Sequence, residues 1–154
     1  MRSEQLRDLI IRPVLKYLGM WSLEAEDLVL GTACAESLCG DYIRQVTSNG
    51  YGPAMGIYQM EMNTCKDIYA NFLSYKKDLL EKVNKLLIPT LSYEQNLVSN
   101  LMFATAMCRI HYYRVKEAIP KTLIGQAEYW KKYYNTEKGA GTVAGYIDKV
   151  NKLK

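Results

Sequence analysis

The chain of 154 residues is predicted to be a mainly α-helical protein with one short non-helical insertion. Apolar side chains recur at helical spacing through most of the sequence, and no stretch shows the sustained alternation that is typical of a β-strand. Between Asp41 and Met62 the segment is dense in glycine and other turn formers. We therefore expect about six to eight helices, with a short irregular loop or β-hairpin between Asp41 and Met62.

Residues 1–21 form the first expected element, an N-terminal helical segment. Leu6, Leu9 and Ile10 fall on one face of a helix. Pro13 either kinks that helix or begins a second one, because proline cannot donate a hydrogen bond inside a helix. We expect a single domain over residues 1–154, with its core in residues 22–151, since 154 residues is close to the commonest domain size.

A second helix is expected from Ser22 to Gly40. Serine is a favoured N-cap residue, and three acidic residues follow it in the first turn, where the helix dipole favours negative charge. Gly40 suits the position just beyond a helix end, which often needs a left-handed backbone. Glu36 then lies in the last turn.

Four further helices are expected, one of them in two pieces. Helical patterning returns at about Thr64 and continues until Ile88 and Pro89 stop it. One long helix is expected from about Tyr93 to Ala118, and two shorter ones at about 123–133 and 142–151, separated by a glycine-rich turn. The buried stripe of the long helix is expected to contain Leu97, Leu101, Ala104, Cys108 and Tyr112.

Composition and charge exclude several classes of protein. The hydrophobic share of 49% and the charged share of 23% are those of a globular chain. No apolar run approaches the roughly 18 residues of a membrane span, and the first residues lack the apolar core and cleavage site of a signal peptide. The net charge of +4 is spread over the chain, so nothing resembles the basic stripe of a nucleic-acid-binding protein.

The four cysteines lack the spacing of metal ligands, and only one histidine, His111, could join them. Each cysteine lies in an apolar context, which favours buried free thiols that pack as small apolar residues. The sequence is also compatible with a disulfide. We expect no metal ion or other cofactor. The cysteines are Cys34, Cys39, Cys65 and Cys108.

A single carboxylate, Glu36, closes a run of small and mostly apolar residues, TACAES. The negative end of the helix dipole and partial burial both disfavour a charged carboxylate, so both raise its pKa. A raised pKa is what a general acid needs to protonate a leaving oxygen near neutral pH. The alternative is an exposed helix-end residue or one bonded to the next loop.

The segment GPAMGIYQMEMNT, residues 52–64, provides a second candidate. Its glycines allow sharp turns or a close approach of the backbone to a ligand. Tyr58 and Gln59 offer an aromatic face and an amide, and sugars are bound by flat apolar surfaces with a few polar groups. The alternative is a glycine-rich connector with a packed tyrosine.

Together these residues resemble the lytic transglycosylases of the lysozyme-like superfamily. In that family a Glu-Ser pair ends a helix and a Gly-Leu-Met-Gln-type motif follows. Here Glu36-Ser37 is followed, 20 positions after the glutamate, by Gly56-Ile57-Tyr58-Gln59-Met60. Tyr134-Asn135, with Gly139 and Gly141 beyond, resembles the family's Ala-Tyr-Asn-x-Gly motif. The resemblance covers roughly residues 25–150, and the sequence around these motifs is most similar to that of bacteriophage members of the family.

Three departures from the family pattern affect the sugar-binding details. Met62 stands where the family usually has a proline, and Tyr133 stands where it has the alanine before Tyr-Asn. The gap from Asn135 to the first glycine is also longer.

The resemblance implies a lysozyme-like fold and an enzyme that acts on peptidoglycan glycan strands. The bond cleaved would be the β-1,4 link between N-acetylmuramic acid and N-acetylglucosamine, with no cofactor. Glu36 would be the single general acid and base. A transglycosylase then closes a 1,6-anhydro ring, whereas a muramidase uses water. The alternative from another class is a virion structural or wall-binding module that keeps the fold without turnover.

The similarity to bacteriophage sequences also implies where the protein acts. The protein would be part of a phage virion, as a tail or ejected protein acting on the bacterial periplasm and cell wall, or would be made in the host cytoplasm and released. Its partners would be glycan strands and other virion proteins, and neither nucleic acid nor a transmembrane segment is expected.

The motif matches also imply roles for residues around Glu36. Ser37 and Tyr134 would hold the glutamate, Asn135 would fix its own turn, and Gln59 would bind an N-acetyl or hydroxyl group of a sugar. The full set of orienting and substrate-binding residues implied in this way is Ser37, Gly56, Tyr58, Gln59, Tyr134 and Asn135, with Tyr58 as a stacking face.

A second acid bears on the choice between the two reactions, because two-carboxylate glycosidases use one to activate water or form a covalent intermediate. The candidates are Asp41 and Glu61. Asp41 also suits an Asx turn after the helix, and Glu61 also suits the cap of the next helix. His111 is expected to be a packed or surface histidine and not a catalytic base. Five aromatic residues near it or near the Tyr-Asn pair are expected in the core or at the rim: Tyr112, Tyr113, Tyr129, Trp130 and Tyr133.

Overall fold

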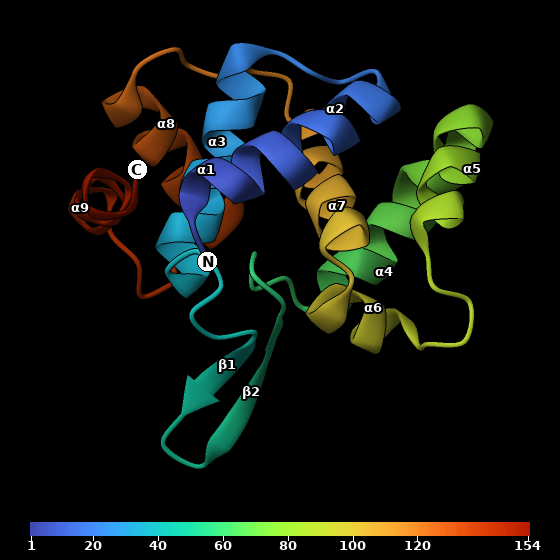
Figure 1. The fold of residues 1–154 in the computed structure, drawn as a ribbon, viewed down its shortest axis with the longest axis horizontal. Helices are drawn as coiled ribbons and strands as arrows, with labels where there is room; N and C mark the ends of the chain where they lie inside the picture. Colours follow the sequence, from blue (N-terminus) through green and yellow to red (C-terminus); the bar gives the residue numbers. More distant parts are fainter.

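A computed structural model describes residues 1–154 as a set of helices around one antiparallel hairpin (Figure 1). The predicted mainly α-helical class is confirmed. The segment between Asp41 and Met62 is a hairpin, in which β1 (Arg44–Thr47) pairs with β2 (Gly50–Met55). The hairpin extends away from the helical body in Figure 1.

The N-terminal segment is one continuous helical stretch made of α1 (Ser3–Leu6), η1 (Arg7–Ile11) and α2 (Arg12–Leu18). The turn before Pro13 widens to a π-helix. The wider turn accommodates the proline, which has no main-chain N–H to donate. The helix therefore continues through Pro13. The wider turn changes which side chains face inward, so the predicted face is wrong at Leu9: it is 64% exposed, whereas Ile11 is fully buried.

The second helix, α3 (Leu23–Ser37), begins where the sequence predicts. The Ser22 hydroxyl accepts a hydrogen bond from the Ala25 amide at 3.0 Å. The predicted end at Gly40 is wrong, because Leu38 and Cys39 already have left-handed φ angles of 52° and 59°. Glu36 still lies in the last turn. Most residues of α3 are buried, so the helix is enclosed on nearly all sides, and its small side chains allow this close packing.

The next helices follow the predicted two pieces. They are α4 (Met62–Asn71) and α5 (Lys77–Leu86), joined by the short 3₁₀ turn η2 (Leu73–Tyr75). The chain then turns at the predicted stop around Ile88 and Pro89.

The predicted single helix from Tyr93 to Ala118 is wrong, because it is broken into α6 (Tyr93–Ser99) and α7 (Leu101–Tyr113). At the break, Asn100 has an extended backbone and its side chain accepts from the Phe103 amide at 3.1 Å. The Asn100 amide group donates to the carbonyl of Leu86 at 2.8 Å, a contact that helical spacing does not reveal.

The buried stripe of that region is largely confirmed. Leu101 is partly buried, and the four fully buried members are Leu97, Ala104, Cys108 and Tyr112.

The last helices are α8 (Leu123–Trp130) and α9 (Val143–Leu153). Between them, the π-helical turn η3 (Lys131–Asn135) extends α8 to the start of the glycine-rich turn. Thr122 and Thr142 cap the two helices by accepting from the amides three residues later. Both helices lie where the sequence predicts them.

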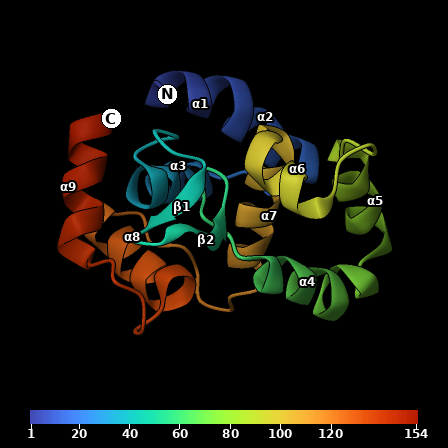
Figure 2. The same cartoon turned by 90° about the horizontal axis from the view of Figure 1, so that it is seen from below.

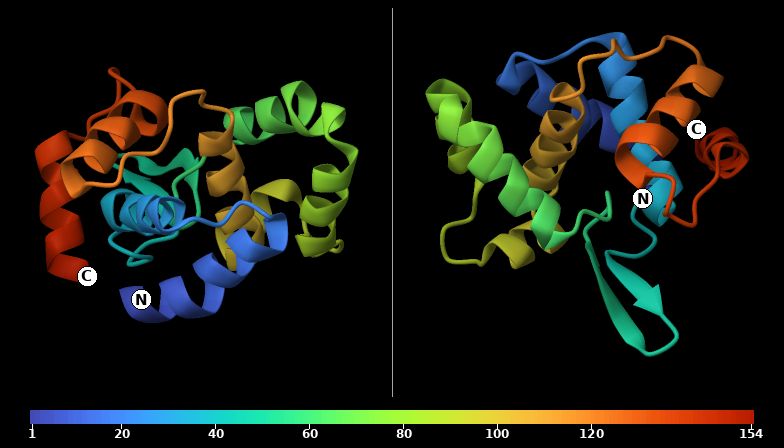
Figure 3. Two further views of the ribbon diagram at one scale, coloured as in Figure 1. Left: turned by 90° about the horizontal axis from the view of Figure 1, so that it is seen from above. Right: turned by 180° about the vertical axis from the view of Figure 1, so that it is seen from behind.

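Two core clusters of side chains join these elements. The first cluster joins the N-terminal helix, α3, α8 and α9, and the second lies mainly among α4, α5, α6 and α7. α2 and α7 contribute side chains to both clusters. Figure 2 shows the hairpin and α3 between α8 and α9 on one side and α4 to α7 on the other, and Figure 3 shows α7 beside α3 at the centre. The four cysteines are buried and form no disulfide, as predicted for free thiols. No helix combines the length and apolar character needed to cross a membrane.

Candidate active site

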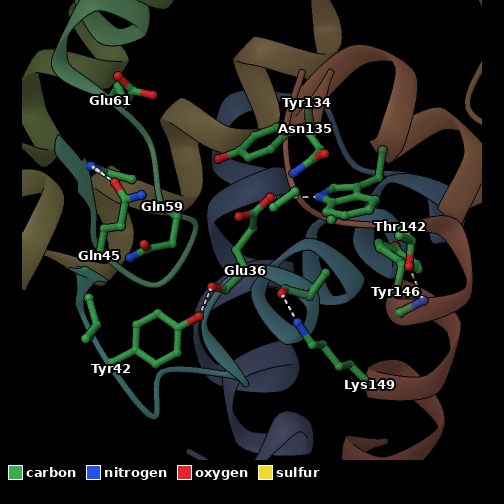
Figure 4. A pocket seen from close by; sticks show the side chains of 18 residues that line it. Glu36, Tyr42, Gln45, Gln59, Glu61, Tyr134, Asn135, Thr142, Tyr146 and Lys149 are labelled. Carbon is green, nitrogen blue, oxygen red and sulfur yellow. Dashed lines mark hydrogen bonds between the residues drawn. The ribbon is translucent and has the colours of Figure 1, made fainter. Parts of the chain in front are cut away.

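The largest cleft, of about 580 Å³, opens between the hairpin and the η3–α9 side of the molecule (Figure 4). Glu36 enters it from the end of α3, and Gln59 from the loop after β2. Trp130, Tyr134 and the glycine-rich turn after η3 form the opposite wall. Three segments far apart in the sequence therefore meet around one carboxylate.

The Glu36 carboxylate is held by an indole. Trp130 donates from Nε1 to Glu36 Oε1 at 2.9 Å. Tyr42 donates its hydroxyl to the main-chain oxygen of Glu36 at 2.7 Å. Glu36 is partly buried, and its side chain lines the cleft.

Burial raises the pKa of Glu36 from its ordinary value of 4.5 to about 7. The Trp130 hydrogen bond and the positive charge of Lys149 oppose this rise, because both favour the carboxylate. Near neutral pH both the protonated and the charged form of the group are therefore accessible. It is able to give a proton to a leaving oxygen and then take one back.

The end of α3 is fixed by donors from other elements. Lys149 of α9 donates from Nζ to the main-chain oxygen of Ala35 at 3.0 Å. Such a cation at a helix C-terminus satisfies an unpaired carbonyl and opposes the negative end of the dipole. Together with the Tyr42 bond, this fixes the two carbonyls on either side of the Glu36 backbone.

Ser37 does not contact the Glu36 carboxylate, contrary to the predicted orienting role. Its hydroxyl donates to the main-chain oxygen of Ile57 at 2.7 Å and accepts from the Gly40 amide at 2.9 Å. Ser37 therefore joins the end of α3 to the loop that carries Gln59.

Of the three binding residues predicted in the loop after β2, only Gln59 reaches the cleft. Gln59 lines the cleft with a left-handed φ of 50°, and its amide nitrogen donates to the main-chain oxygen of Gly56 at 2.9 Å. Tyr58 is buried and its hydroxyl pairs with that of Thr105 at 2.8 Å, so the predicted stacking face is wrong. Gly56 has a φ of 75°, and a Cβ there would overlap the carbonyl of Leu97. Its role is close packing, not ligand approach.

The Tyr-Asn pair lies in the wall of the cleft. Tyr134 donates its hydroxyl to the main-chain oxygen of Tyr58 at 2.6 Å, so the predicted bond to Glu36 is wrong. Its ring stacks on Tyr112 with centroids 5.2 Å apart. Asn135 accepts from Lys131 Nζ at 2.8 Å, and the same ammonium donates to the Gly139 carbonyl at 3.0 Å. These bonds match the predicted role of Asn135 in its turn.

The two candidates for a second acid differ in position. Asp41 is exposed and does not line the cleft. Glu61 lines the cleft but is exposed, and its side chain makes no capping bond to α4. Figure 4 shows its carboxylate well apart from that of Glu36.

The role of Trp130 is not predicted from the sequence, where this residue is expected only among core and rim aromatics. Trp130 is buried, yet its indole nitrogen is the donor that holds Glu36. The available signal was its spacing, because a residue four positions before Tyr134 shares its helix face. Tyr146 packs on the indole with centroids 5.3 Å apart, and a Cβ on Gly31 would overlap the Tyr146 hydroxyl. Gly31 thus leaves room for the tyrosine that supports Trp130.

The other aromatic residues match their predicted places. Tyr112 and Tyr129 are buried, and Tyr113 is exposed. His111 packs edge-on against Tyr134 with centroids 5.2 Å apart, and burial lowers its pKa to about 4. It is therefore uncharged near neutral pH. No group of three or more histidine, cysteine or acidic side chains is placed to hold a metal ion.

Comparison of the chain with known protein families, with characterised proteins and with solved structures finds no match. The function is therefore inferred from the cleft itself and from the motif resemblance. The cleft offers one carboxylic acid that titrates near neutral pH, with amide and aromatic groups around it. This arrangement suits acid-base chemistry on a hydroxyl-rich ligand.

Proposed function

We propose that the chain is a peptidoglycan lytic transglycosylase that cleaves the β-1,4 bond between N-acetylmuramic acid and N-acetylglucosamine. One observation carries the proposal: Glu36 lies in the largest cleft, with its pKa raised to about 7 and an indole N–H on its carboxylate. The motif resemblance supports it, because all three matching segments border this cleft. A lysozyme-like fold is part of the same proposal.

In the proposed reaction Glu36 acts twice. First its carboxyl group gives a proton to the glycosidic oxygen, the bond from that oxygen to muramyl C1 breaks, and the N-acetylglucosamine unit leaves as an alcohol. The positive charge that develops at C1 is stabilised by the N-acetyl group of the same muramyl unit. The Glu36 carboxylate then takes the proton of the C6 hydroxyl, whose oxygen bonds to C1 and closes the anhydro ring.

A muramidase that acts on the same bond is the second candidate, because Glu61 lines the same cleft. A water would then attack C1 in place of the C6 hydroxyl. The separation of Glu61 from Glu36 in Figure 4 favours the single-carboxylate reaction. Because the motif sequences are most similar to bacteriophage versions, we also propose that the chain is a phage protein. It would act on the bacterial wall either as part of the virion or after release from the host cell.

The direct test is incubation of purified peptidoglycan with wild type and Glu36→Gln, followed by mass spectrometry of the products. We expect 1,6-anhydro products from wild type and a loss of at least about a hundredfold in the variant, since a general acid-base group contributes roughly 10²–10⁴-fold. Glu128→Gln, an exposed carboxylate on α8 away from the cleft, is the matched control and keeps full activity.

Other outcomes separate the alternatives. Reducing ends in place of anhydro ends identify a muramidase, and their loss in Glu61→Gln makes Glu61 the second acid. Equal release by wild type and Glu36→Gln rejects Glu36 as the catalytic group. Wall binding without any release supports the non-catalytic module.

A further inference from the structure

The charges that line the cleft are few. Glu36 and Glu61 are the acidic side chains, and Lys149 is the one cationic side chain. The other polar groups that line it are uncharged amides and hydroxyls. Whenever Glu36 is protonated, Lys149 is therefore the main charge near the reacting position.

Lys149 has unused binding capacity. Its ammonium has three donors, and one of them is used on the Ala35 carbonyl. It forms no ion pair within the chain, whereas Lys152 on the same helix pairs with Asp148 at 3.2 Å. Figure 4 shows the Lys149 ammonium directed toward the end of α3 beside Glu36.

The proposed substrate carries a carboxylate close to the bond that is cleaved, and Lys149 lies near the corresponding position in the cleft. The muramyl ring that contributes the cleaved C1 carries a lactyl group on C3 of the same ring. In a strand without peptides this lactyl group ends in a carboxylate. In a peptide-bearing strand it is an amide, and the carboxylates lie on the attached peptide. A negative charge is thus expected within about one sugar ring of Glu36.

We propose that Lys149 is a specificity-determining residue that binds a carboxylate of the muramyl unit, on its lactyl group or on its attached peptide. The inference rests on the proposed function. A role limited to capping α3 would affect all ligands equally, so a dependence on the ligand's carboxylate separates the two roles.

The test measures binding in a Glu36→Gln background, so that the glycan stays intact. Three probes are titrated by calorimetry: a peptide-free muramyl-glucosaminyl oligosaccharide, its lactyl methyl ester, and the peptide-bearing oligosaccharide. We expect esterification to weaken binding about tenfold when Lys149 is present, and less than about twofold after Lys149→Met. Lys149→Arg retains the preference, and Lys152→Met is the matched control on α9 with an unchanged preference. Circular dichroism checks that each variant is folded.

The outcomes are distinct. A Lys149-dependent preference for the free acid over its ester identifies the lactyl carboxylate. A Lys149-dependent preference for the peptide-bearing strand, with no effect of the ester, identifies a peptide carboxylate. Binding of all three probes with equal affinity overturns the role of Lys149 and leaves the proposed function intact. Failure of every probe to bind overturns the proposed function, and this inference with it.

Discussion

The core cluster under the cleft contains four tyrosines, a tryptophan and three cysteines, whereas the cluster among α4, α5, α6 and α7 is mostly aliphatic and methionine side chains. In the first cluster several polar atoms need specific partners, such as the paired hydroxyls of Tyr58 and Thr105. The second cluster needs mainly volume and apolar surface. The first cluster therefore supports the residues of the cleft, whereas the second cluster contributes mainly to the stability of the fold.

Backbone strain is divided in the same way. Four residues other than glycine have left-handed φ angles: Leu38, Cys39, Gln59 and Thr136. All four lie at segments that border the cleft, and none lies in α4, α5, α6 or α7. Such conformations cost of the order of 1 kcal/mol each and persist where surrounding contacts impose them. We therefore expect changes in the second cluster to alter stability alone, whereas changes beside the cleft alter the chemistry as well.

The largest stability effect is expected from Phe103→Ala in the second cluster. Phe103 is fully buried on α7, so its truncation leaves a cavity that costs about 3–5 kcal/mol. We expect a large fall in the urea midpoint with unchanged products per folded molecule at low temperature. Met102→Ala, 43% exposed on the same helix, is the control with little change. A changed product pattern in Phe103→Ala would contradict the expected difference between the two clusters.

The next effect is a gain of stability in Glu36→Gln. The folded-state pKa of Glu36, about 7, lies above its ordinary value of 4.5. Below pH 4.5 the carboxyl group is protonated in both states and does not lower the free energy of unfolding. Between pH 4.5 and 7 it lowers this free energy progressively, and above pH 7 the loss stays constant. At about 1.4 kcal/mol for each pKa unit, the uncharged variant is about 3 kcal/mol more stable at pH 8.5 and equal at pH 4. Urea unfolding at both pH values measures this. Equal stability at pH 8.5, or a gain matched by Glu128→Gln, would contradict it.

The smallest effect is expected from Trp130→Phe. Loss of the indole donor removes a bond that favours the carboxylate, so the pKa of Glu36 rises and the basic limb of the activity profile moves to higher pH. Activity at the optimum falls roughly tenfold, because a hydrogen bond to a charged group contributes at least about 1.5 kcal/mol and about 1.4 kcal/mol corresponds to a factor of ten. Tyr134→Phe is the comparison, because its hydroxyl contacts Tyr58 and not Glu36. A shift of the basic limb in Tyr134→Phe alone would reverse the assignment.

Local signals in the sequence predicted much of the fold. The Ser22 cap, the two pieces around η2 and the stop near Pro89 are set by residues within a few positions. The break at Asn100 could not be predicted in this way, since Asn100 bonds to a carbonyl 14 positions away. The exposure of Leu9 depends on the widened turn before Pro13, which moves the helix face.

The candidate site divides along the same line. The sequence by itself determined that Glu36 ends a helix of small residues and that Gln59 and the Tyr-Asn pair belong to segments able to border it. Tertiary structure decided that Trp130, 94 positions from Glu36, donates to the carboxylate, that Lys149 fixes the preceding carbonyl, and that Tyr58 is buried. The physical reason is range: caps and turns are satisfied by neighbours in sequence, whereas the burial, hydrogen bonds and charges that set a carboxyl pKa come from whichever elements pack around it.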